Sequence, residues 1–96
     1  MPPSGKQEAR LVLRLYVAGN APNSVRAVSN AQAMCDAHFA ARYELEIVDL
    51  LEQPQRALTD GVLVTPTLIR LHPLPVQKVV GTLSDAERLL LVLGDP

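Results

Sequence analysis

The 96-residue chain has little of what many small functional domains depend on. It contains a single cysteine, so no intramolecular disulfide can form, and a reducing compartment is expected. Aromatic residues make up only 3% of the sequence, which leaves few platforms on which nucleic-acid bases could stack. The formal net charge of -1 provides no general attraction to DNA or to an anionic membrane. We therefore expect neither a nucleic-acid nor a membrane partner.

Long hydrophobic runs are missing as well. The longest apolar run covers residues 89–93, far short of the roughly 20 residues that a membrane-spanning helix needs. The first ten residues are mostly polar and do not resemble a secretory signal. Together with the unpaired cysteine, these features predict a cytoplasmic protein.

Patterns typical of catalysis or metal binding are equally scarce. Cys35 and His38 lie three positions apart, but zinc needs three or four such ligands and the only other histidine is His72. The G-x-S-x-G motif of serine hydrolases does not occur. Residues 19–24 lack the glycines of a phosphate-binding loop, although the following helix start with Arg26 could hold an anion weakly. We expect no enzymatic activity, cofactor or metal, and Cys35 acting as a small buried hydrophobe.

The first half of the chain predicts a βαβ unit. Residues 10–18 place Leu11, Leu13, Leu15 and Val17 on one face of a strand, and the second face is mostly apolar too. This pattern indicates a strand covered on both sides. After a turn at 19–23, residues 24–39 form a predicted helix that Asn23 or Ser24 can cap. Its predicted buried positions are Val25, Val28, Ala31, Gln32, Cys35 and Phe39. A second strand at 43–50 should pair with the first in parallel, because a helix connects them.

The second half is harder to assign. We expect a flexible tail at residues 1–9 and one domain at 10–96. The expected elements are a short helix at 54–58, a strand at 62–71, a turn at 72–75, a strand at 76–81 and a terminal helix at 84–93. Ser84 and Glu87 fit a capping box for that helix, and Gly94 can close it. The apolar run at 89–93 would also make a buried strand, so this assignment stays open.

Polar side chains on the second strand have ordinary structural interpretations. Glu44 and Glu46 share one strand face, which is typical of a solvated surface rather than of an acid–base pair. Asp49, at the end of the strand, is expected to cap the loop that follows.

A proline interrupts the strand predicted at 62–71. Proline cannot donate to a sheet and restricts the residue before it, so Pro66 should not lie inside a central strand without a reason. A cis Thr65–Pro66 bond is such a reason, and thioredoxin-like proteins keep one beside their reactive site. In thioredoxins Cys-x-x-Cys follows the first strand, whereas residues 18–24 contain no cysteine here. The resemblance implies a thioredoxin-like scaffold, an α/β fold in the order βαβαββα with a mixed four-stranded sheet, without its redox centre.

Longer motifs resemble one particular family. Residues 15–27, LYVAGNAPNSVRA, are similar nearly letter for letter to the opening of the KaiB circadian clock family. Further similar blocks follow in the same order at Tyr43 with 47–50, 54–55, 57–63, 65–68, 73–76, Gly81 and 83–84. Because the similarity spans about residues 11–93, nearly the whole folded chain, it is specific.

The resemblance implies a non-enzymatic regulator that binds the hexameric clock ATPase KaiC and acts in clock or stress-response signalling. It also implies a second, tetrameric fold in which the half after about Leu51 is rearranged. A dimer or tetramer is therefore expected. The family's partner-contacting positions fall on Arg26, Arg70, Gln77 and Lys78, which in this sequence surround the turn at 72–75 or begin the first helix. The positions tied to refolding are Thr65, Pro66, Gly81 and Thr82.

Departures from the family pattern qualify the resemblance, and one of the four partner-contacting positions is neutral here where the family has a basic residue. Glu46 stands where cyanobacterial members carry lysine, and Thr82 where they carry aspartate. These differences indicate a homologue from outside the cyanobacteria. Two alternatives remain: a thioredoxin-like sensory or adaptor domain related to those of clock histidine kinases, and a thiol enzyme that uses Cys35.

Overall fold

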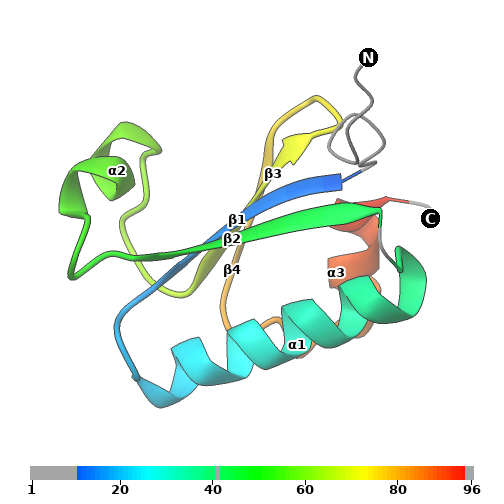
Figure 1. Cartoon of the computed structure of the whole chain (residues 1–96), viewed down its shortest axis with the longest axis horizontal. Coiled ribbons are helices and arrows are strands. Elements are labelled where there is room, and N and C mark those ends of the chain that lie inside the picture. The colour runs from blue at the N-terminus through cyan, green and yellow to red at the C-terminus, as the bar shows by residue number, and fades with distance from the viewer. Residues whose placement is uncertain (1–10, 41, 95–96) are drawn as a thin grey trace.

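A four-stranded mixed sheet organises the molecule (Figure 1). The computed structural model describes residues 11–40 and 42–94, so the expected tail at 1–9 lies outside the described residues. Along the chain the elements are β1 (Leu11–Val17), α1 (Pro22–His38), β2 (Tyr43–Asp49), α2 (Pro54–Thr59), β3 (Thr67–His72), β4 (Gln77–Val80) and α3 (Ala86–Leu93). This is the predicted order βαβαββα, and α3 is a helix rather than a strand.

The strand order β2-β1-β3-β4 follows from the connections. β1 and β2 pair in parallel because the long helix α1 carries the chain back to the start of the sheet. β3 then pairs with β1 in the antiparallel sense, and β4 pairs with β3 across a tight proline-rich turn. β1 is therefore central, and β2 and β4 form the two edges.

Two cores cover the two faces of the sheet. Both α1 and α3 lie on one face of the sheet (Figure 1). They pack there against the leucines of β1, and the small side chains of Ala27, Ala31 and Cys35 let α1 approach closely. On the other face the short helix α2 inserts Ala57 beside Tyr16 and Val48. The second core is much smaller, so α2 needs further attachments to stay in place.

The buried stripe of α1 differs from the predicted one. Val25 is 54% exposed and Gln32 is exposed, whereas Ser24 and Ala27 are buried. The helix begins at Pro22, two residues earlier than predicted, because proline is favoured at the first helical position. The predicted cap by Asn23 or Ser24 is wrong: Ala21 occupies the N-cap without a side-chain bond. The Ser24 hydroxyl instead accepts a hydrogen bond from the Ala18 backbone N–H (3.0 Å).

The later boundaries also shift. Only the part of the predicted 62–71 strand that follows Pro66 joins the sheet, because proline lacks the N–H that a ladder requires. In α3 the N-cap is Asp85, whose carboxylate accepts from the Arg88 N–H (3.2 Å), so the predicted capping box is wrong by one residue. Gly94 closes this helix as expected, with φ at 91°.

Candidate functional site

The loops after β1 and β2 meet where a thioredoxin-like protein has its reactive centre. The Asp49 carboxylate accepts from the backbone N–H groups of Gly19 (3.1 Å) and Leu51 (2.9 Å), which confirms the predicted capping role and joins the two loops. Gly19 has φ at 53°, a conformation that glycine adopts at low cost. No thiol lies in the loop that follows β1, so the position that would carry redox chemistry is a hydrogen-bonded turn.

The four residues predicted to take part in refolding lie near one another. Thr65–Pro66 is cis, as expected, and the Pro66 carbonyl accepts from the N–H of Gly81 (3.0 Å). Thr82 follows, and its carbonyl accepts from the Asn30 side chain on α1 (2.8 Å). The next residue, Leu83, has φ at 62°, which costs a residue with a side chain about 1–2 kcal/mol. Backbone strain supports assigning this loop to a switching region, which stays a prediction.

Cys35 is buried in the main core. Its side chain is fully covered, and burial raises the pKa of the thiol to about 11. The thiolate, the reactive form, is therefore scarce at neutral pH. The expectation of a small buried hydrophobe is confirmed. Among residues 11–40 and 42–94 no three potential ligands gather that could hold a metal ion.

We expect native Cys35 to resist modification and the protein to lack disulfide reductase activity. Ellman's reagent should react with the folded chain at least a hundredfold more slowly than with the chain unfolded in guanidinium, because the thiol is both buried and protonated. Insulin reduction by dithiothreitol should proceed equally with and without the protein. An acceleration that disappears in Cys35→Ser would show instead that the cysteine is catalytic.

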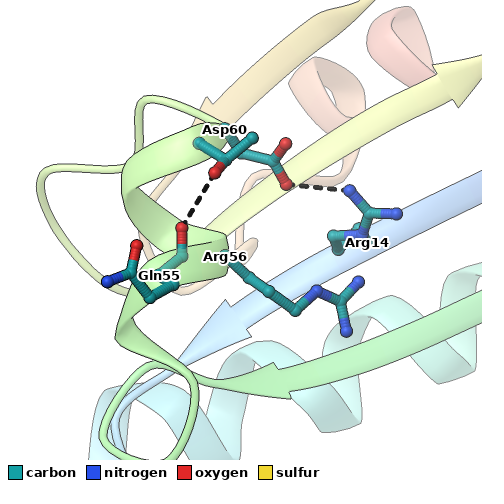
Figure 2. A pocket seen from close by; sticks show the side chains of 5 residues that line it. Arg14, Gln55, Arg56 and Asp60 are labelled. Atoms are coloured by element: carbon teal, nitrogen blue, oxygen red, sulfur yellow. Dashed lines mark hydrogen bonds and ion pairs between the residues drawn. The ribbon is translucent and has the colours of Figure 1, made fainter.

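A cluster of charged residues occupies the second face of the sheet, between α2 and the strands (Figure 2). We call it the α2 cluster; its members are Arg14, Tyr16, Glu46, Arg56 and Asp60. Arg14 donates to Glu46 (3.0 Å) and to Asp60 (2.8 Å), while Arg56 donates to both oxygens of Glu46 (2.7 and 2.8 Å). The Tyr16 hydroxyl bonds to the Asp60 carboxylate and to the Arg56 carbonyl (2.9 Å).

The pKa values of Glu46, Asp60 and Tyr16 shift in the directions that their mutual pairing predicts. Hydrogen bonds from Arg56, assisted by Arg14 and opposed by burial, lower the pKa of Glu46 to about 2. Burial disfavours ionisation of Asp60, but the bonds from Tyr16 and Arg14 outweigh it and lower its pKa. The pKa of Tyr16 is raised, first by burial and then by its bond to Asp60. All four charged groups are therefore ionised at neutral pH.

The α2 cluster borders a cavity of ≈ 220 Å³, lined by Arg14, Gln55, Arg56, Thr59 and Asp60. Figure 2 shows the two guanidinium groups and the Asp60 carboxylate around this space. Because two arginines face two carboxylates, the cluster neutralises itself, and a charged ligand would have to displace an existing pair. Its contacts explain how α2 is held on the sheet better than they explain ligand binding.

Sequence reasoning missed this cluster and treated Glu46 as solvated. The side chain is 47% exposed, so that description was right in part, yet it bridges two arginines. The signal was available for one pair: in the parallel register Arg14 lies directly opposite Glu46. The contribution of α2 could not be found in this way, because no sequence rule places a short helix over a particular strand.

We expect Glu46→Gln to lower the free energy of unfolding by no more than about 1 kcal/mol at pH 7, because water screens a half-exposed pair. A lowered pKa gives stability that is present above the unfolded value and is lost as pH falls through the folded value. The difference between variant and wild type should therefore shrink from about pH 4.5 toward pH 2. Urea denaturation at several pH values measures it. A difference that grows on acidification would contradict the assignment.

The predicted partner-binding residues do not converge on one surface. Arg26 is exposed on α1, which contacts β1 and β2 at one side of the sheet, whereas Gln77 and Lys78 are exposed on the opposite edge strand β4. Lys78 donates to the Asp60 carbonyl (2.7 Å), so it faces α2. Arg70 pairs in register with Gln77 but is only 7% exposed. The prediction treated Arg70 as a surface residue, and that part is wrong.

The fold and this site define a thioredoxin-fold protein without the thiol pair. A search of solved structures agrees: the N-terminal domain of Synechococcus elongatus SasA superimposes with a TM-score of 0.75 at 27% identity, covering 97% of this chain and 90% of that one. Mitochondrial thioredoxin 3 from Saccharomyces cerevisiae gives 0.72 at 16% identity, over 93% of this chain and 80% of that one, which is a likeness of fold alone.

Sequence comparison is more specific. The family model described as the KaiB domain matches residues 14–94. The circadian clock oscillator protein KaiB of Nostoc punctiforme is 47% identical over 92% of this chain and 85% of its own length. The circadian clock protein KaiB3 of a Synechocystis strain is 45% identical over 88% and 82%. The chain belongs to the KaiB family, which supports a regulatory role connected with the clock.

Proposed function

We propose that this protein is a non-enzymatic, cytosolic KaiB-family regulator that docks on a KaiC-like hexameric ATPase and modulates clock or stress-response signalling. The observation that carries the proposal is a thioredoxin-like scaffold of the KaiB family whose reactive loop holds no thiol and whose one cysteine is buried. Such a scaffold retains surfaces for partners but not the nucleophile of redox catalysis.

Exposed charges on α1 and β4 suit an acidic partner. Arg26 and Lys78 are exposed residues on different elements, although the Lys78 ammonium also donates to the Asp60 carbonyl. The outer edge of β4 has no strand beside it within the described residues. Because Arg26 and Lys78 lie toward opposite sides of the sheet, a partner that meets both must be large, as a hexamer is. We assign Gln77, beside Lys78, to the same contact surface.

Capture of the ATPase tests this proposal directly. The tagged protein, incubated with the KaiC-like ATPase of its own cell, should retain the hexamer on a resin in a salt-dependent manner. Light scattering of the free protein reports whether it is a monomer, a dimer or a tetramer, and the resemblance favours self-association. Failure to retain the ATPase at any nucleotide state or salt concentration would overturn the proposal.

A second candidate is an adaptor domain of the kind found at the start of clock histidine kinases. The similarity to the N-terminal domain of SasA supports it, since that structure covers nearly all of this chain. The two candidates differ in what the gene encodes. Sequencing the full reading frame for a kinase domain separates them, because an adaptor domain would be joined to one.

A further inference from the structure

Arg70 is the most unusual cation in the described part of the chain. It lies in the middle of β3 and points to the face that α3 covers, and it is 7% exposed. Burying a guanidinium removes it from water, so its donors must find acceptors in the protein. What those acceptors are decides what the residue does.

Both acceptors are backbone carbonyls from other segments. Nη1 donates to the Val92 carbonyl (2.7 Å), and Nη2 donates to the Pro75 carbonyl (2.9 Å). Nε is buried and has no partner in the described structure. One planar group thus joins β3 to the last turn of α3 and to the turn between β3 and β4.

The position of Val92 gives the first bond its physical meaning. The last four carbonyls of a helix lack an intrahelical partner, and the same end carries the negative end of the helix dipole. A cation placed there satisfies a carbonyl and is attracted by the dipole. Gly94, the C-cap of α3, is close as well, since a Cβ built on it would lie 3.9 Å from Nη1. Arg70 therefore caps α3 from the sheet.

A helix of eight residues depends on such attachments. Helices this short are unstable in isolation, and α3 has only Leu89 and Leu93 buried in the core. The second bond acts on the neighbouring strand, because Pro75 lies two residues before Gln77 at the start of β4. Loss of the guanidinium would release both α3 and the beginning of β4.

We propose that Arg70 is a positioning residue, which fixes α3 and the 72–76 turn so that β4 presents Gln77 and Lys78, and that it does not touch the partner. The proposal rests on the proposed function, because it concerns the same docking surface. In this proposal Arg70 affects binding through the position of β4 and not through a charge contact with the partner.

Hydrogen exchange of the free protein tests the geometric claim without any partner. In both Arg70→Met and Arg70→Lys, the backbone amide hydrogens of the last turn of α3 and of β4 should exchange with solvent at least tenfold faster than in the wild type. Lysine keeps the charge but lacks the planar fork that reaches two carbonyls. Lys78→Met, the control, should leave α3 unchanged. Wild-type exchange rates in both Arg70 variants would overturn the proposal; if Arg70→Met does not fold, Arg70→Lys decides.

Binding to the ATPase then separates positioning from contact. Arg70→Met should weaken binding about tenfold at every salt concentration, with the slope of log affinity against log salt unchanged, whereas Lys78→Met should reduce that slope. Arg70→Lys should not restore affinity. Restoration by lysine together with a reduced slope in Arg70→Met would show direct contact. If wild type does not bind the ATPase at all, the proposed function fails, and the exchange experiment still decides the role of Arg70.

Discussion

Asp60→Ala should lower the free energy of unfolding by about 2 kcal/mol at pH 7, because it leaves the half-buried Arg14 guanidinium and the Tyr16 hydroxyl without one of their acceptors. The loss should concentrate in α2, since Asp60 ends that helix. Urea denaturation followed by circular dichroism gives the global value, and hydrogen exchange locates it. Tyr16→Phe, which removes a hydroxyl and leaves the carboxylate, should cost about 1 kcal/mol.

Control and pH dependence sharpen this prediction. Glu52→Ala removes an exposed carboxylate near α2, and we expect a change within about 0.5 kcal/mol. Because the pKa of Asp60 is lowered in the folded protein, its contribution is present above the ordinary pKa of 3.8 in the unfolded chain and is lost as pH falls through the lower folded pKa. An Asp60→Ala variant as stable as Glu52→Ala at pH 7 would show that the contacts of Asp60 do not hold α2 on the sheet.

Lys78→Glu should weaken capture of the KaiC-like ATPase by tenfold or more, and Arg26→Glu should weaken it in the same direction. Reversing a charge opposite an acidic partner replaces attraction with repulsion, and the effect should diminish at high salt. Titration calorimetry or surface binding at several salt concentrations measures both variants.

Arg42→Glu is the matched control for these reversals. Arg42 is exposed and precedes β2, away from β4 and from the start of α1. It carries the same change of charge, so it accounts for any general effect on the net charge of the protein. Equal weakening by all three variants would mean that the partner senses overall charge rather than the particular positions of Arg26 and Lys78.

The elements of the first half could be predicted because their signals are local. The alternation in β1 and the length of α1 specify a strand and a helix, and the crossover rule then specifies parallel pairing with β2. Boundaries shifted where two local rules competed. Pro22 extended α1 past the serine expected to cap it, and Asp85 took the cap of α3 from Ser84.

The sequence by itself determined the class of fold, the absence of a thiol pair and the family, because each depends on residues near one another or on long shared motifs. Only the tertiary structure decided which charged side chains are buried and which partners they bind. Arg14 meets Asp60 across 46 positions of sequence, and Arg70 is covered because α3 returns to that face of the sheet. A side chain's exposure depends on which distant segment packs over it, and no local pattern along β3 contains that information.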